Sequence, residues 1–78
     1  ESDEFFFTVQ VGSFVSQSNA FRLQSELRRR GYSAELRETE AQGRIFHRVR
    51  VGRFHRRQDA EDQMRVLQRD GFPARIFP

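Results

Sequence analysis

The sequence repeats itself with an offset of 40 residues, and this internal repeat limits the possible folds more than any other feature. Residues 8–14 (Thr-Val-Gln-Val-Gly-Ser-Phe) align without a gap on residues 48–54 (Arg-Val-Arg-Val-Gly-Arg-Phe). The other matched pairs are Asn19 with Asp59, Ala20 with Ala60, Leu27 with Leu67, Gly31 with Gly71, Tyr32 with Phe72, Ala34 with Ala74 and Leu36 with Ile76. Most pairs are apolar residues or glycines, which indicates two copies of one structural unit.

Each copy is predicted to be a strand, a helix and a second strand. Residues 5–13 alternate with period two and place Phe7, Val9 and Val11 on one face and Phe6, Thr8 and Gln10 on the other. Gly12 is expected to end this strand. Residues 45–51 form the matching strand of the second copy, and residues 32–38 and 72–77 form the closing strands. A polar hairpin loop from Thr39 to Arg44 joins the copies.

Each predicted helix carries an apolar stripe at helical spacing. The stripes are Ala20, Leu23 and Leu27 in the first helix and Ala60, Met64 and Leu67 in the second. We expect N-caps at Ser18 or Asn19 and at Asp59, because such side chains accept from the first free backbone N–H groups of a helix. Gly31 and Gly71 are placed for left-handed C-caps.

Two such units joined by a hairpin predict an α+β fold of the ferredoxin-like βαββαβ type. Short connections and right-handed crossovers favour a four-stranded antiparallel sheet, with both helices on one face and the first and third strands in the centre. Pro73 indicates that the last strand is an edge strand, since proline cannot donate to a ladder. Residues 5–78 are thus predicted to be a single domain, and residues 1–4 a solvated lead-in or the end of a linker.

The sheet face without helices is predicted to bind a ligand. Its outward positions are Phe6, Thr8, Gln10, Ser33, Glu35, Arg37, Phe46, Arg48, Arg50, Arg75 and Phe77. Arginine and amide side chains at the centre of a rigid sheet are pre-positioned for a ligand. Two other interpretations stay open: each phenylalanine packs over the sheet edge, and the use of arginine for all 14 basic residues reflects genomic base composition.

These residues resemble the SPOR (sporulation-related repeat) family. Residues 9–14 with Asn19, Ala20, Leu23, Leu27 and Gly31 resemble its first half, and residues 48–54 with Ala60, Leu67 and Gly71 resemble its second half. The resemblance covers the chain from about Phe5 to Ile76. Arg53 departs from it, because the family commonly has proline there, and this departure is expected to alter only the turn from strand to helix.

The resemblance implies a bacterial domain that binds septal peptidoglycan through its sheet face, preferring glycan strands denuded of stem peptides by amidases. It implies targeting of a parent protein to the division septum or cell wall, and it makes Gln10 and Ser13 glycan contacts. The predicted glycan-binding residues are Thr8, Gln10, Ser13, Phe46, Arg48, Arg50, Arg75 and Phe77.

The chemistry of such a ligand agrees with these residue types. Sugar hydroxyl and acetamido groups need planar hydrogen-bonding partners, and the apolar faces of sugars need aromatic ones. Removal of the stem peptide exposes the lactyl carboxylate of N-acetylmuramic acid, for which an arginine fork is a natural partner. Arg50, the counterpart of Gln10 in the repeat, is the first candidate. Steric exclusion of stem peptides explains the same preference and stays open.

Two rival functions use the same face. RNA-recognition domains share the βαββαβ order, but residues 45–51 do not match their consensus on the third strand. The net charge of +3 is also modest for a phosphate binder. We therefore expect no nucleic-acid partner, whereas a protein–protein module remains an alternative.

No enzymatic activity, catalytic residue, metal or cofactor is predicted. The histidines are His47, expected in the core or at its edge, and His55, expected in a solvent-facing turn, and there is no cysteine. The sequence has no apolar run long enough to span a membrane and no signal-peptide pattern. We expect a monomer without membrane contact of its own, in the bacterial cell envelope (periplasm or cell wall), as part of a longer exported or membrane-anchored protein.

Overall fold

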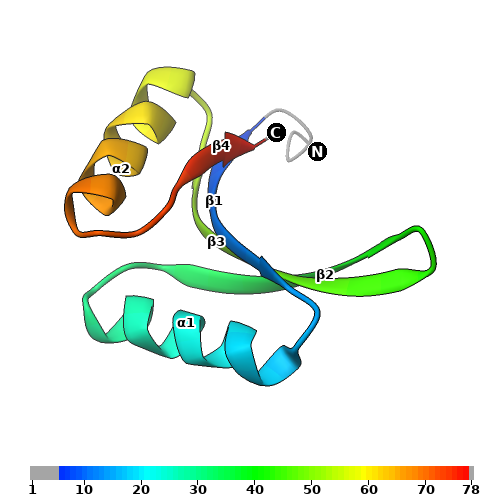
Figure 1. The fold of residues 1–78 in the computed structure, drawn as a ribbon. Helices are drawn as coiled ribbons and strands as arrows, with labels where there is room; N and C mark the ends of the chain where they lie inside the picture. Colours follow the sequence, from blue (N-terminus) through cyan, green and yellow to red (C-terminus); the bar gives the residue numbers. More distant parts are fainter. Residues whose placement is uncertain (1–5, 78) are drawn as a thin grey trace.

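The computed structural model of the chain describes residues 6–77, so the lead-in predicted at residues 1–4 lies outside the described part. The elements are β1 (Phe7–Phe14), α1 (Gln17–Arg29), β2 (Ala34–Ala41), β3 (Arg44–Phe54), α2 (Arg57–Arg69) and β4 (Arg75–Phe77). The strands form one antiparallel sheet in the order β2-β3-β1-β4. In Figure 1, α1 lies below β2, and α2 lies beside β4. The predicted ferredoxin-like βαββαβ fold is confirmed.

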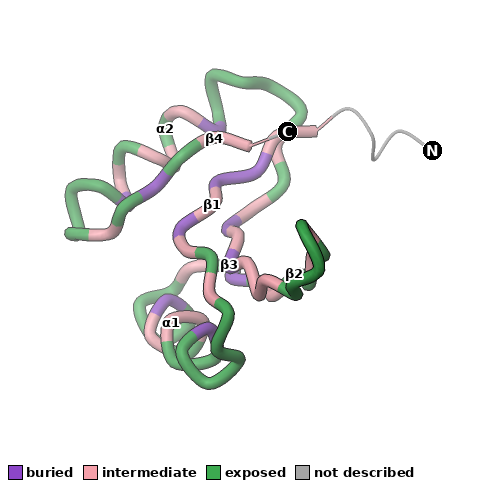
Figure 2. Tube along the Cα trace, turned by 45° about the vertical axis from the view of Figure 1, so that its right-hand side comes forward, coloured by how far each residue is buried: buried purple, intermediate pink, exposed green. Residues whose placement is uncertain are grey.

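One apolar core lies between the sheet and the two helices. Its buried members are Val9, Val11, Ala20, Leu27, Ala34, Val49, Val51, Ala60, Leu67 and Ala74. Leu23 and Met64 are half-buried and pack against this core. Figure 2 shows buried segments on both central strands and on both helices. The predicted strand register is therefore correct, because a slip of one residue would turn Val9 and Val49 away from the helices.

The central hairpin is longer than predicted. β2 and β3 stay paired as far as Ala41 and Arg44, so most of the expected loop is strand. Only Gln42 and Gly43 form the turn, and both have positive φ, at 55° and 78°. Two consecutive left-handed residues are the conformation of a type I′ turn, whose twist matches that of the flanking strands and lets the ladder continue to the turn.

The predicted N-caps are wrong, while the predicted glycine positions are correct. Ser16 caps α1 and accepts a hydrogen bond from the backbone N–H of Asn19 at 3.3 Å. Arg56 occupies the N-cap of α2 without a side-chain hydrogen bond, and Asp59 lies in the first turn, where its charge meets the helix dipole. Gly31 and Gly71 both have φ of +95°, as a left-handed helix end requires.

β4 is shorter than predicted and begins after Pro73. It pairs with β1 only over residues 8–10 and forms an edge of the sheet, as expected. β1 in turn runs past Gly12 to Phe14. Among the described strands, the part of β1 from Val11 onward therefore pairs with β3 alone. Within residues 6–77, neither helix has the length and apolar character needed to cross a membrane.

Candidate functional site

Two rows of polar side chains cross the sheet on the face opposite the helices, which we call the open face. In the first row, Gln10 lies between Arg50 of β3 and Arg75 of β4, and Arg50 also lies opposite Glu35 of β2. In the second row, Arg48 lies between Ser13 and Arg37. Residues directly opposite in an antiparallel pair share one face, so each row is a set of close neighbours.

A β-bulge places Gln10 and Ser13 on the same face. Strict alternation would put residues three apart on opposite faces. The register of β1 against β3 shifts between Gln10 and Gly12, which inserts one extra residue into β1. Ser13 then lies opposite Arg48 on the open face. A Cβ atom on Gly12 would lie 2.9 Å from Cδ2 of Leu23 in α1, so only glycine fits this bulge without displacement of its neighbours.

Three arginines lie together on the open face and form no ion pair among the described residues. Within residues 6–77, the side chains of Arg37, Arg48 and Arg50 form no ion pair and no hydrogen bond. Burial lowers the pKa of Arg50, and the charges of Arg37 and Arg48 lower it further, while Glu35 opposes the shift. Like charges directly opposite in a sheet are destabilising. The cluster is thus suited to an anionic ligand that would offset this repulsion.

The guanidinium groups present a defined edge. Nε of Arg48 and Nε of Arg50 are buried and have no hydrogen-bond partner within residues 6–77. The terminal nitrogens of both groups are not buried in this way, so the Nη1–Nη2 edge remains for a two-point contact with a carboxylate. The Phe77 ring lies over these side chains, with its centroid 4.4 Å from Cζ of Arg50 and 5.9 Å from Cζ of Arg48.

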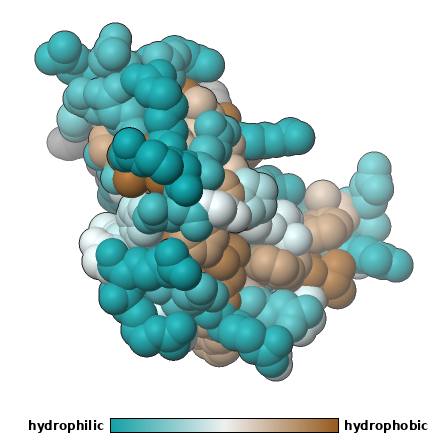
Figure 3. All heavy atoms as spheres, turned by 60° about the vertical axis from the view of Figure 1, so that its left-hand side comes forward, coloured by the Kyte–Doolittle hydropathy of each residue, from teal (hydrophilic) through white to brown (hydrophobic). Residues whose placement is uncertain are grey.

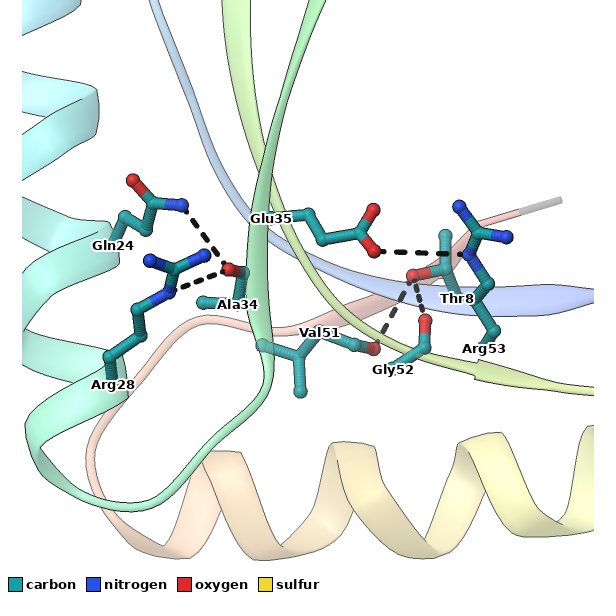
Figure 4. A network of polar contacts seen from close by, with 8 residues as sticks. All are labelled: Thr8, Gln24, Arg28, Ala34, Glu35, Val51, Gly52 and Arg53. Carbon is teal, nitrogen blue, oxygen red and sulfur yellow. Dashed lines mark hydrogen bonds and ion pairs between the residues drawn. The ribbon is translucent and has the colours of Figure 1, made fainter.

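Thr8 is not exposed on this surface, which corrects its expected position. It is only 6% exposed, and its hydroxyl donates to the carbonyl oxygen of Gly52 at 2.7 Å. A second contact, to the carbonyl of Val51, is 3.3 Å long (Figure 4). The register shift beside Val9 makes this contact possible, because Gly52, with φ of +76°, turns its carbonyl toward Thr8. Thr8 therefore holds two strands together and leaves no group for a ligand.

The remaining predicted residues fall into a cluster and one outlier. The cluster contains Gln10, Ser13, Arg48, Arg50, Arg75 and Phe77. Phe46 lies opposite Thr39, farther along the hairpin, and is half-buried. Arg37 and Glu35 were predicted to lie on this face but were left out of the predicted glycan-binding residues. Glu35 approaches Nε of Arg53 at 3.9 Å at the side of the cluster (Figure 4).

A cleft of about 390 Å³ opens beside the cluster, between β1 and the segment that precedes β4. It is lined by residues 10–13, Gln68 and residues 73–75. The side chain of Gln68 donates to the carbonyl of Ala74 at 3.2 Å and fixes this segment, as Arg28 does for Ala34 in the first half. Gln10 and Ser13 thus take part both in the open face and in this cleft.

The histidines and the apolar surface do not form a second site. Nδ1 of His47 lies 3.7 Å from Glu38, and His55 is exposed. Among the described residues, no group of His, Cys, Asp and Glu side chains is suited to hold a metal ion. The large apolar side chains that the described part exposes most are Val15, Phe21 and Ile45. On the side drawn in Figure 3, hydrophilic side chains predominate and the apolar ones are concentrated in the lower half.

Comparison with known proteins identifies the fold and the family of the chain. A search of curated proteins finds no match. Among solved structures, the chain is similar to the peptidoglycan binding domain of the B. subtilis cell wall lytic enzyme CwlC, with a TM-score of 0.76 and 24% sequence identity over 92% of this chain and 86% of that one. The family model of the SPOR domain matches residues 3–76, and the chain therefore belongs to the SPOR domain family.

Proposed function

We propose that this domain binds the glycan strands of bacterial peptidoglycan through its open face and that it catalyses no reaction. The observation that carries the proposal is the placement of Gln10 and Ser13 on one surface, next to three arginines that form no ion pair among the described residues. Membership in the SPOR family supports it, as does the similarity to a peptidoglycan binding domain. An amide, a hydroxyl and guanidinium groups supply both donors and acceptors for sugar hydroxyl and acetamido groups.

The preferred ligand in this proposal is glycan that has lost its stem peptides. Each N-acetylmuramic acid of such a glycan carries a free lactyl carboxylate, whereas a stem peptide converts that carboxylate into a neutral, bulky amide. The Nη1–Nη2 edges of Arg48 and Arg50 suit a carboxylate, and Arg37 adds positive potential. Exclusion of the stem peptide by its bulk alone is the competing explanation.

The proposed place of action is the bacterial cell envelope, where the domain, as a monomer, would direct a longer parent protein to the septum or wall. Binding to peptidoglycan requires only that the open face is accessible, and neither helix contributes to it. The loss of septal localisation on mutation of the open face, in a fusion to a fluorescent protein, would support this part of the proposal.

A sacculus pulldown tests the function directly. We expect the domain to be retained more strongly by amidase-treated sacculi than by intact ones, and RNA added as a competitor should not release it. The double variant Gln10→Ala with Ser13→Ala should lose retention, since each lost hydrogen bond costs about 1 kcal/mol. The matched control is Gln17→Ala with Ser25→Ala, two exposed positions on α1. Release by RNA, or equal retention of both double variants, would contradict the proposal.

A further inference from the structure

The two halves of the domain differ at the cleft beside β1. Between β3 of the second half and the start of β2 of the first half, the backbone N–H of Gly52 donates to the carbonyl of Ser33 at 3.3 Å and closes the space between the two strands. No hydrogen bond among the described residues joins Gly12 to Pro73, the counterparts of these two residues, and the space there remains open. The cleft is therefore a local departure from the repeat and not a general consequence of the fold.

The walls of this cleft combine apolar and polar groups. Its apolar side is formed by Val11, Pro73 and Ala74. Ser13 and Arg75, both exposed, add a hydroxyl and a guanidinium group. Gln10 also lines the cleft, and its amide oxygen is buried without a hydrogen-bond partner among the described residues. A buried polar atom without a partner costs free energy, and rotation of the Gln10 amide into the cleft would let a suitable ligand recover that cost.

We infer that the cleft is a subsite for the acetamido group of an N-acetylated sugar, and that Gln10 selects this group. An acetamido group has a methyl group for the apolar side, an N–H donor and a carbonyl acceptor. The amide of Gln10 offers the complementary acceptor and donor, and it pairs with another amide in either orientation of its oxygen and nitrogen. Arg75 is a further donor to the acetamido oxygen. The inference rests on the proposed function and names the group that occupies the cleft.

The same chemistry predicts which sugars are rejected. A sugar with a free amine at this carbon lacks the methyl group and the acceptor, and it is an ammonium ion at mildly acidic pH. Arg50 and Arg75, which flank Gln10, repel that charge. A glutamate at position 10 would instead accept from an ammonium ion and would leave the acetamido oxygen without its amide donor. Substitution of Gln10 should therefore change the preference between the two sugars and not only the overall affinity.

The test titrates two soluble denuded glycan preparations with the domain at about pH 6 and about 1 M salt, where the Debye length is about 3 Å and charge effects at longer range are screened. One preparation is fully N-acetylated and the other has free amines in place of the acetamido groups. We expect the wild type to prefer the N-acetylated glycan by about tenfold, equivalent to roughly 1.4 kcal/mol. Gln10→Met should reduce this ratio to about one, and Gln10→Glu should invert it.

Two controls separate this inference from the proposed function. Gln17→Glu makes the same change of charge on α1 and should keep the wild-type ratio. Chemical re-acetylation of the free-amine glycan should restore its affinity for the wild type. Equal binding of both preparations by the wild type, or an unchanged ratio in Gln10→Glu, would overturn the acetamido subsite while leaving peptidoglycan binding intact. Failure of the wild type to bind either preparation would instead overturn the proposed function.

Discussion

The ring of Phe77 stacks on the guanidinium group of Arg50, with 4.4 Å between the ring centroid and Cζ. Phe77 also lies opposite Thr8 at the end of β4, so the backbone pairing of an edge strand brings the ring onto the arginine cluster. The aromatic face that was expected to receive a sugar is thus in contact with the arginine that was expected to receive a carboxylate. We therefore expect Phe77 to act on the site by holding Arg50 in place.

Replacement of Phe77 by leucine should weaken binding of denuded glycan about threefold, because a partly exposed cation–π contact contributes about 0.5–1 kcal/mol. Leucine keeps an apolar side chain but removes the π face. Phe77→Tyr should retain the wild-type affinity. Phe72→Leu is the control, since it removes a similar stack on Arg30, at 5.2 Å, that does not involve the open face. An affinity that rises in Phe77→Leu would mean that the ring covers the arginine and does not position it.

The salt dependence of binding should distinguish charge recognition from steric exclusion of stem peptides. If Arg50 pairs with lactyl carboxylates, wild-type affinity falls as the Debye length shortens from about 10 Å at 0.1 M to about 3 Å at 1 M salt. Arg50→Gln should bind more weakly at low salt and show a flatter salt response. Arg29→Gln removes the same charge from the exposed end of α1 and should behave like the wild type. If the glycan affinity of the wild type did not change with salt and Arg50→Gln bound equally well, steric exclusion of stem peptides would be the remaining explanation for the preference.

Thr8→Val should affect stability and leave binding unchanged. The hydroxyl of Thr8 donates to the carbonyl of Gly52 inside the sheet, and valine has the same shape without the donor. The expected loss is about 1 kcal/mol, which lowers Tm by about 4–8 °C in a domain of this size. Thr8→Ser should retain the hydrogen bond and most of the stability. If Thr8→Val instead kept its full stability but bound glycan more weakly, this result would show that Thr8 contributes to ligand binding.

Much of the fold could be predicted because the repeat marks the same positions twice. Val9 and Val49 occupy equivalent buried positions, as do Leu27 and Leu67. Each copy of the repeat therefore predicts the strand faces, the helix stripes and the core independently of the other copy. The first residues of the helices were harder to predict from the repeat. Ser16, Ser18 and Asn19 are all good N-cap residues, and the choice of Ser16 depends on where β1 ends, which packing determines.

The site was harder to predict because it depends on two register shifts in β1–β3 pairing. Period-two alternation places Thr8 and Gln10 on the same face. The register shift near Gly52 nevertheless buries the hydroxyl of Thr8 against the carbonyl of Gly52. The shift at Gly12 brings Ser13 to the open face, and only the glycine itself signals it. The cleft depends on a hydrogen bond that is missing between Gly12 and Pro73, which no pattern of residue types reveals.

Gly12→Ala tests the bulge. The added methyl group would lie 2.7 Å from Cε2 of Phe14 and 2.9 Å from Cδ2 of Leu23, so these side chains or β1 must move. We expect a loss of about 1–3 kcal/mol in the free energy of unfolding, as for other overpacked sites, and weaker glycan binding because Ser13 shifts relative to Gln10. Combination with Leu23→Ala removes one of these two obstacles, so the two losses should be less than additive. Strict additivity in chemical denaturation would show that Leu23 is not the obstacle.

The contact between Tyr32 and Asp70 should make the stability of the domain sensitive to alkaline pH. The hydroxyl of Tyr32 donates to the carboxylate of Asp70, while Arg30 stacks on Phe72, so each half of the repeat supplies an aromatic ring to a charged residue of the other. The hydrogen bond to Asp70 raises the pKa of Tyr32 above its ordinary value of 10.0, and burial and the charge of Asp70 act in the same direction. The folded state thus holds the phenolic proton more tightly than the unfolded state.

This contribution to stability is fully present below about pH 10 and is lost as the pH rises through the raised pKa of Tyr32. Tyr32→Phe should therefore be less stable than the wild type at neutral pH, by an amount near the lower end of the ~0.5–1.5 kcal/mol typical of protein hydrogen bonds, because the contact is exposed. The gap between the two proteins should close as the pH passes above about 10, since phenylalanine has no proton to lose. Thermal unfolding of both proteins across this range measures the gap, and a gap that stays constant at high pH would show that the hydroxyl stabilises the domain by packing and not by donating to Asp70.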